Sequence, residues 1–285
     1  AAAPMVAMSA ARAGELRSSC FADDLGFPPD IGRWSEDELL AHFESGGKSM
    51  PTWRRGAGAR VLCLHGGGAS SKVMELQTRK LRIKLGKSVH FDYLEGPREW
   101  RDAVDPTLVR FFGQGPYYGW YGVENDAPAD RPYMDKLLDP SVTFTYTEVE
   151  LALEKVETAI AESGPYDALL AFSQGTIVAT MLTAVARRRW LEGKGPAPSW
   201  RHLALFCAMP ARDTRYLHLF ESTIDFPCTL VFGRKDGFYS WGQRLLSTFC
   251  SPAVFEHDEG HRFPSDDQVN ADIVEHLSAE LGVTS

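Results

Sequence analysis

From residue 60 onward the chain alternates short apolar runs with longer stretches in which apolar side chains recur every three or four positions. The runs predict buried strands at residues 60–65, 89–94, 166–172, 202–208, 228–233 and 253–257. The longer stretches predict helices near residues 70–85, 147–163, 177–185, 239–249 and 269–281. Strands that lack polar alternation and are separated by helices indicate a mostly parallel sheet covered on both faces. We therefore predict one doubly wound α/β domain over residues 59–285.

The first 58 residues do not follow this pattern, and we interpret them as an N-terminal extension with one short helix. Ser35 and Glu38 form a capping box before the apolar positions Leu39, Leu40 and Phe43. Residues 1–14 contain one arginine and no acid, as in a remnant of an organelle transit peptide. A leader without fixed structure fits equally, as does a segment that docks a protein partner. We therefore expect the protein to be cytoplasmic or, if residues 1–14 are such a remnant, to lie in an organelle interior such as the plastid stroma.

A second irregular segment, residues 98–146, is rich in aromatic residues interrupted by glycine and proline. A connection of this length in a compact domain is often a lid or a binding loop. It lies between two predicted strands, so it should overhang the carboxyl ends of the sheet, where ligands bind in such folds. We expect it to wall a substrate pocket through Tyr117, Tyr118 and Trp120. The alternative is an aromatic plug that fills the edge of the core.

Charge and cysteine content narrow the function classes. The net charge of −8 and pI near 5.5 argue against a partner that is a nucleic acid, which requires a basic face. Five cysteines show neither a disulfide framework nor the spacing of a zinc site, so we expect a reducing compartment and no metal. No apolar run approaches the roughly 20 residues of a transmembrane segment.

The sequence AFSQG at residues 171–175 places a serine between an apolar strand and an apolar helix. In this context a small-x-Ser-x-small motif forms a sharp turn that exposes the serine oxygen above the sheet. Ser173 is the predicted nucleophile, and the backbone N–H of Gln174 is one predicted oxyanion-hole donor. Ala171 departs from the usual glycine by one methyl group.

A glycine-rich turn, LHGGG at residues 64–68, follows the first strand. Its free N–H groups suit a carbonyl oxygen, and Gly67 is the predicted second oxyanion-hole donor. We expect His65 to orient the turn and not to act as a base. A phosphate-binding loop would require Gly-Lys-Ser/Thr after four spacer residues, which HGGGASSK does not supply.

Two further polar residues follow later strands in the order nucleophile, acid, base. Asp236 follows the strand that ends at Gly233, and His261 follows the strand at 253–257. They are the predicted acid and base. The residues themselves leave alternatives open, which are His257 or Asp258 near the base and Asp213 or Asp225 as the acid.

These motifs together resemble the eukaryotic "family of serine hydrolases" esterases of the α/β-hydrolase superfamily. That group includes the ovarian-cancer-associated esterase and fungal polyketide-releasing thioesterases. The matching stretches are VLCLHGGG, GPYYGWYGVE, GPYDALLAFSQGT, FPCTLVFGRKD and HDEGHRFP, between about residues 60 and 265. Glu259 stands where the family's GGH motif has its first glycine. The resemblance implies a cofactor-free hydrolase of small-molecule esters or thioesters with apolar acyl groups.

Two other functions remain compatible with the sequence. One is a catalytically idle hydrolase-fold subunit that serves as an interaction scaffold, because a fold does not guarantee an activity. The other retains the triad but uses it for the proton transfers of a lyase.

Overall fold

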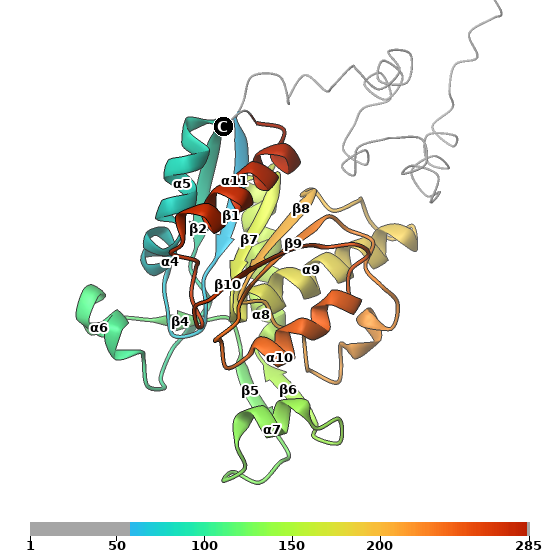
Figure 1. Ribbon diagram of the computed structural model, residues 1–285. Helices are drawn as coiled ribbons and strands as arrows, with labels where there is room; N and C mark the ends of the chain where they lie inside the picture. The colour runs from blue at the N-terminus through green and yellow to red at the C-terminus, as the bar shows by residue number, and fades with distance from the viewer. Residues whose placement is uncertain (1–57, 284–285) are drawn as a thin grey trace, which may run out of the picture. The chain divides into compact units, whose positions relative to one another are not determined.

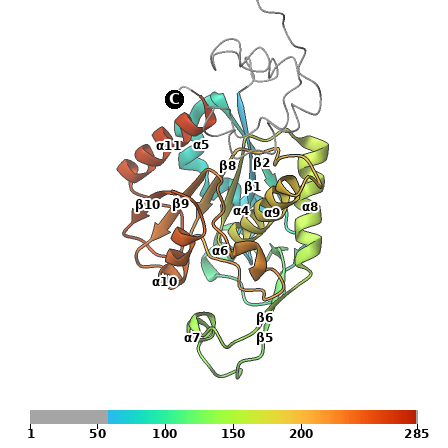
Figure 2. The ribbon, with the colours of Figure 1, turned by 90° about the vertical axis from the view of Figure 1, so that its right-hand side faces the viewer.

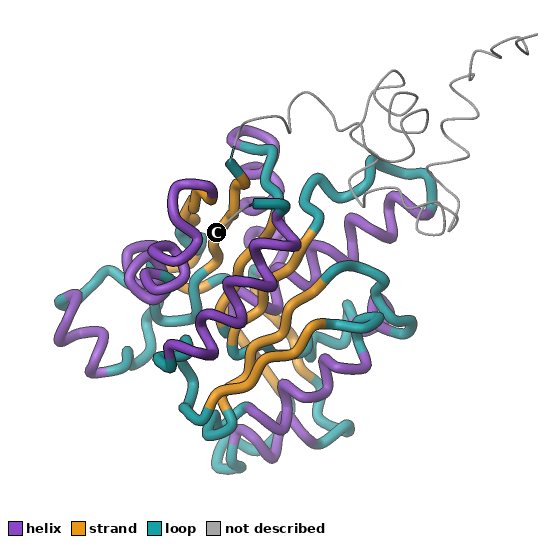
Figure 3. Tube along the Cα trace, turned by 45° about the horizontal axis from the view of Figure 1, so that its top comes forward, coloured by secondary structure: helices purple, strands orange, loops and turns teal. Residues whose placement is uncertain are grey.

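The computed structural model describes residues 58–283, and the fold below is that of residues 58–185 with 200–283. Six parallel strands form the central sheet in the order β10-β9-β8-β7-β1-β2. Figure 3 shows the strands in orange. Their bounds are β1 (Ala59–Leu64), β2 (Val89–Leu94), β7 (Ala168–Phe172), β8 (His202–Phe206), β9 (Cys228–Gly233) and β10 (Ala253–His257). All residues of β7, β8 and β9 are buried, as their unbroken apolar character predicts. The structure confirms the α/β fold class.

Helices cover both faces of the sheet (Figure 2). One face carries α4 (Ser71–Gln77), α5 (Arg79–Leu85) and α11 (Asp267–Leu281), and the other carries α8 (Val149–Ser163) and α9 (Gln174–Leu191). The single helix predicted near residues 70–85 is two helices that meet at Thr78, followed by the 3-10 turn η3 (Gly86–Ser88). The Thr78 hydroxyl donates to Met74 O at 2.9 Å and lies 2.7 Å from the Tyr93 hydroxyl, which fixes this break.

Two further connections contain only short helical turns. The helix predicted at residues 239–249 is one turn of α-helix, α10 (Tyr239–Gly242), continued by the 3-10 helix η5 (Gln243–Ser247). A further 3-10 turn, η4 (Leu217–Phe220), precedes β9.

The aromatic segment 98–146 has secondary structure of its own, so the expectation of an irregular connection was wrong. It contains β3 (Arg98–Glu99), α6 (Pro106–Phe112), β4 (Tyr118–Gly119), β5 (Gly122–Asn125) and α7 (Tyr133–Leu138), and leads into β6 (Phe144–Thr147). β5 pairs with β6, and this hairpin with α7 extends beyond the carboxyl ends of the sheet (Figure 1). The segment overhangs the sheet where the sequence predicted.

Buried charges attach this hairpin to the main body. Asp213, an alternative for the acid, is fully buried and accepts hydrogen bonds from Tyr146 N at 2.8 Å and Arg215 Nη2 at 2.6 Å. Arg212 donates to the carbonyl oxygens of Leu137 and Val142. The Asp213 carboxylate therefore anchors the hairpin.

The predicted N-terminal helix lies outside the described residues. The predicted domain boundary at residue 58 coincides with the first described residue. Within residues 58–283, no helix has the length and apolar character needed to cross a bilayer.

Candidate active site

Ser173 occupies the sharp turn between β7 and α9 with a backbone φ of 51°, in the left-handed region. Its N–H donates to Phe206 O at 3.0 Å on the neighbouring strand, which holds the turn in place. A Cβ on Gly175 would lie 2.6 Å from Leu64 O and 2.7 Å from His65 O. This close approach explains the small residue two positions after the serine. Ala171 is fully buried, so the sheet accommodates its methyl group.

The three predicted triad residues form one chain of hydrogen bonds. His261 Nε2 lies 2.8 Å from Ser173 Oγ, and His261 Nδ1 lies 2.7 Å from Asp236 Oδ2. The exposed fraction of the side chain is 31% for His261 and 4% for Asp236. The chain of hydrogen bonds therefore leads from Ser173 through the partly exposed His261 to the buried Asp236 carboxylate.

Main-chain contacts join the loop that carries Asp236 to the loop that carries His261. Arg234 N donates to His257 O at 2.8 Å, and Lys235 N donates to Glu259 O at 3.0 Å. A Cβ on Gly233 would lie 2.4 Å from Gly260 O. The two loops therefore pack backbone to backbone, which fixes the separation of Asp236 and His261.

The environment of Asp236 favours its charged form. Burial opposes ionisation, but hydrogen bonds from the His261 ring and from Phe238 N–H, at 2.9 Å, outweigh it and lower the pKa of Asp236. A carboxylate held in this way keeps the proton of His261 on Nδ1, which leaves Nε2 free to accept a proton from serine.

Glu259, which departs from the family's glycine, braces the base loop. Its carboxylate accepts hydrogen bonds from Ser265 N at 2.6 Å and Ser265 Oγ at 2.8 Å, and pairs with Arg262 at 3.0 Å. Burial opposes ionisation of Glu259, but the hydrogen bonds from Ser265 and the nearby Arg262 outweigh it and lower the pKa of this carboxyl group. The substitution adds side-chain contacts to the loop that positions His261.

The structure separates the other candidates from this chain of hydrogen bonds. His257 is buried, and neither ring nitrogen has a hydrogen-bond partner among the described residues. Asp258 is exposed and pairs with Arg234 at 2.8 Å. Asp225 is exposed. Of the two histidines, His261 is the one that contacts Ser173.

The glycine turn after β1 packs directly against the serine. A Cβ on Gly66 would lie 3.3 Å from Ser173 Cβ, and one on Gly67 would lie 3.1 Å from Gln174 Oε1. His65 is fully buried, with Nδ1 2.7 Å from Gly66 O, and its Nε2 accepts a hydrogen bond from Gly96 N at 2.9 Å. The turn that contains Gly67 is therefore held rigidly beside the start of α9.

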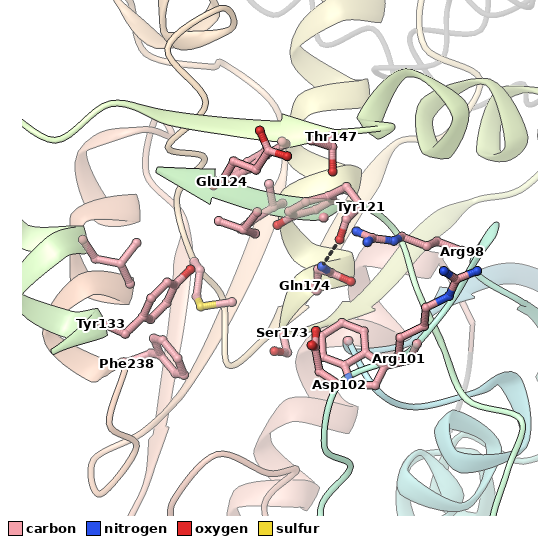
Figure 4. Close-up of a pocket in the computed structure, with 18 of the residues that line it drawn as sticks. Arg98, Arg101, Asp102, Tyr121, Glu124, Tyr133, Thr147, Ser173, Gln174 and Phe238 are labelled. Atoms are coloured by element: carbon pink, nitrogen blue, oxygen red, sulfur yellow. Dashed lines mark hydrogen bonds between the residues drawn. The ribbon is translucent and has the colours of Figure 1, made fainter. Parts of the chain in front are cut away.

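The Gln174 side chain has a role that sequence reasoning missed. Its Oε1 accepts from Trp120 N at 2.8 Å, and its Nε2 donates to Tyr121 O at 2.9 Å (Figure 4). Gln174 thus attaches the aromatic segment to the turn that carries Ser173. Nothing in the AFSQG motif distinguishes this side-chain function from the backbone role predicted for the same residue.

The three predicted pocket residues are not on the pocket wall. Trp120 is fully buried and donates to His65 O at 2.7 Å. Tyr117 is buried against Ala69 and Val73, and Tyr118 pairs through its backbone with Ala69. Trp120 and Tyr118 thus bond to His65 and Ala69, which flank the three glycines of the turn. The plug interpretation fits Tyr117 and Trp120, which are buried, whereas Tyr118 is half-buried.

Other residues of the same segment do line a cavity of about 650 Å³ that contains Ser173. An apolar part is formed around Tyr133 and Phe238, with Leu137, Ile177, Met209 and Trp241, and a charged part around Arg98, Arg101 and Asp102. Ser173 lies between the Tyr133 and Arg101 sides in Figure 4. The cavity therefore offers distinct environments on either side of Ser173.

Comparisons with known proteins show the family and the fold of this chain. The family described as "Serine hydrolase (FSH1)" matches residues 57–273, more than half of the chain. The chain is 29% identical to esterase FPY3 of Fusarium mangiferae, over 72% of this chain and 88% of that protein. It is 32% identical to the probable esterase tazC of Aspergillus terreus, over 72% and 85%. Zea mays acyl-protein thioesterase 2 shares the fold, with a TM-score of 0.50 and 16% identity over 79% of this chain and 94% of that one.

Proposed function

Since the chain belongs to the FSH1 family of serine hydrolases, we propose that it cleaves small carboxylic esters or thioesters with Ser173, His261 and Asp236 as its triad. The observation that carries this proposal is the continuous chain of hydrogen bonds from Ser173 Oγ through His261 to Asp236, bordering a cavity. The esterase names of its relatives support ester hydrolysis.

The first chemical step is acylation. His261 Nε2 accepts the proton of Ser173 as Oγ attacks the substrate carbonyl carbon. The Asp236 carboxylate stabilises the imidazolium through Nδ1–H. Collapse of the tetrahedral intermediate transfers the proton from His261 to the departing alcohol or thiol, which leaves an acyl group on Ser173. Water then repeats the sequence with His261 as base and releases the acid.

Developing charge on the carbonyl oxygen needs preorganised donors. We assign this role to the backbone N–H groups of Gly67 and Gln174. Gln174 begins α9, where N–H groups lack helical partners and the helix dipole favours negative charge. Gly67 lines the same cavity as Ser173.

The substrate side of the proposal follows from the lining of the cavity. Tyr133, Phe238 and Trp241 offer an aromatic surface for an apolar acyl group. The charged side at Arg98 and Arg101 suits a polar leaving group. The proposed substrates are therefore small molecules that pair an apolar acyl group with a more polar alcohol or thiol.

A fluorophosphonate probe and an aryl ester together test this function. Ser173→Ala should abolish labelling and reduce turnover by at least about 10⁴-fold. His261→Ala should be nearly as damaging, and the double variant should lose little more, because the residues act as a unit. A burst of the aryl product should precede the steady state.

His257→Ala is the matched control, since this neighbouring histidine contacts no triad atom among the described hydrogen bonds. Probe labelling without turnover of any ester would favour proton-transfer chemistry, and absence of labelling would favour an idle scaffold. More than a tenth of the activity remaining in Ser173→Ala would exclude this serine as the nucleophile.

A further inference from the structure

A cysteine that the proposed reaction does not use lies beside the acid and the base. Cys207 directly follows β8, the strand between those that precede Ser173 and Asp236. It is 2% exposed and has a backbone φ of 47°. Its Sγ, a carboxylate oxygen of Asp236 and a ring nitrogen of His261 all lie within 4.8 Å of one another.

We propose that Cys207, Asp236 and His261 form a reversible inhibitory site for a thiophilic divalent cation, with Zn²⁺ as the representative ion. Sulfur, imidazole nitrogen and carboxylate oxygen are the three donor types that Zn²⁺ uses in proteins. Among the described residues these three are the one group of at least three such donors with this spacing.

Charge balance favours occupancy of this buried position. A thiolate and a carboxylate supply two negative charges and the imidazole is neutral, so the bound dication leaves no net charge. Mg²⁺ binds oxygen ligands and gains no binding free energy from the sulfur, so it should not compete with Zn²⁺ for this site.

The cluster needs only a small adjustment to hold the ion. Bonds of about 2.0–2.3 Å to a tetrahedral centre place ligand atoms roughly 3.3–3.8 Å apart. The 2.7 Å contact between His261 Nδ1 and Asp236 Oδ2 must open by about 1 Å to reach that spacing. The partly exposed His261 side chain is the route of entry.

Occupancy stops the proposed reaction by changing the tautomer of His261. In the working site Nδ1 carries the proton and Nε2 accepts one from Ser173. The ion takes the Nδ1 lone pair, so the ring proton must reside on Nε2, where it points at the serine oxygen. His261 then cannot act as a base. The thiol proton passes to solvent, so one proton is released for each ion bound.

Inhibition is the first test. Aryl-ester turnover of the wild type should fall as Zn²⁺ is added, return on addition of EDTA, and be unaffected by Mg²⁺. Cys207→Ser retains a hydroxyl of similar size and removes the sulfur. Its inhibition midpoint, relative to its own rate in EDTA, should rise by at least about 100-fold, since even outer-shell partners of a metal contribute about 10–100-fold. Equal inhibition of the wild type and Cys207→Ser would overturn the proposal.

Cys250→Ala is the control, because Cys250 is an exposed thiol that could bind the ion instead. Its inhibition midpoint should equal that of the wild type. A midpoint that rises in Cys250→Ala and not in Cys207→Ser would place the ion on the exposed thiol.

A second test does not depend on esterase activity, so failure of the proposed function leaves it intact. Co²⁺ added to the wild type should give the near-ultraviolet thiolate-to-cobalt charge-transfer absorption, and Ser173→Ala should retain it. Should Cys207→Ser not fold, proton release on the unaltered protein decides. Release of about one proton per Zn²⁺ supports the site. The absence of both proton release and cobalt–thiolate absorption would reject it.

Discussion

The packing of Gly233 allows a quantitative test of how acid and base are positioned. In Gly233→Ala the new Cβ would lie 2.4 Å from Gly260 O and 2.6 Å from Glu259 O, where about 3.4 Å is ordinary contact. Both neighbours are backbone atoms in the loop that carries His261, so the loop must shift by about 1 Å. A 1 Å misplacement of a reacting group costs on the order of 100-fold in rate. We therefore expect kcat/KM to fall roughly 100-fold.

The assay is aryl-ester turnover beside a thermal melt. Overpacking of this kind costs about 1–3 kcal/mol of unfolding free energy, so the variant should still fold. Gly237→Ala is the matched control, because a Cβ there meets nothing within 4 Å although the residue adjoins Asp236. Its rate should stay within about threefold of wild type, since it removes no contact. Equal losses in both variants, or a Gly233→Ala rate near wild type, would refute the proposed role of the packed loops.

Three other substitutions have distinct expected outcomes. Tyr133→Ala should weaken binding of long acyl substrates by about 1–3 kcal/mol, seen as a raised KM, and leave acetyl esters unaffected. Trp120→Ala should instead lower the unfolding free energy by about 3–5 kcal/mol in denaturant titration, without a change in acyl-length preference. His257→Leu should match or exceed wild-type stability, because burial lowers the pKa of His257 and the unfolded chain binds the proton more readily. The wild type therefore loses stability as the pH falls through about 6.5, the pKa of histidine in the unfolded chain. Thermal melts between pH 8 and 5 should show the melting temperature of the variant rising relative to that of the wild type.

The sequence determined the sheet and predicted which polar residues the assembled sheet would bring together. Apolar strands such as 168–172 have only one favourable environment, a sheet buried on both faces, so their pattern alone predicts the fold. Because parallel strands end at one edge, residues that directly follow them, among them Ser173 and Asp236, were expected to meet there. The chain of hydrogen bonds through His261 agrees with that expectation in geometry.

The sequence could not determine which aromatic residues face the substrate. Trp120 and Tyr121 are adjacent and similar in character, yet one is buried behind the glycine turn and the other lines the cavity. Their directions depend on short strand pairs and on the Gln174 side chain, which are contacts between distant parts of the chain. Composition identified the wall-forming segment, and tertiary packing decided which of its side chains form the wall.

Cys207 shows the same limit at a single residue. Its apolar neighbours correctly predict a buried thiol, and its spacing from Asp236 and His261 along the chain resembles no metal motif. Only the order of β8 beside β9, and the close packing of the loops after β9 and β10, bring the three donors within 4.8 Å. The hydrophobic pattern of each element predicts whether that element is buried. It does not predict which side chains of different elements come close together, because that depends on the assembled sheet.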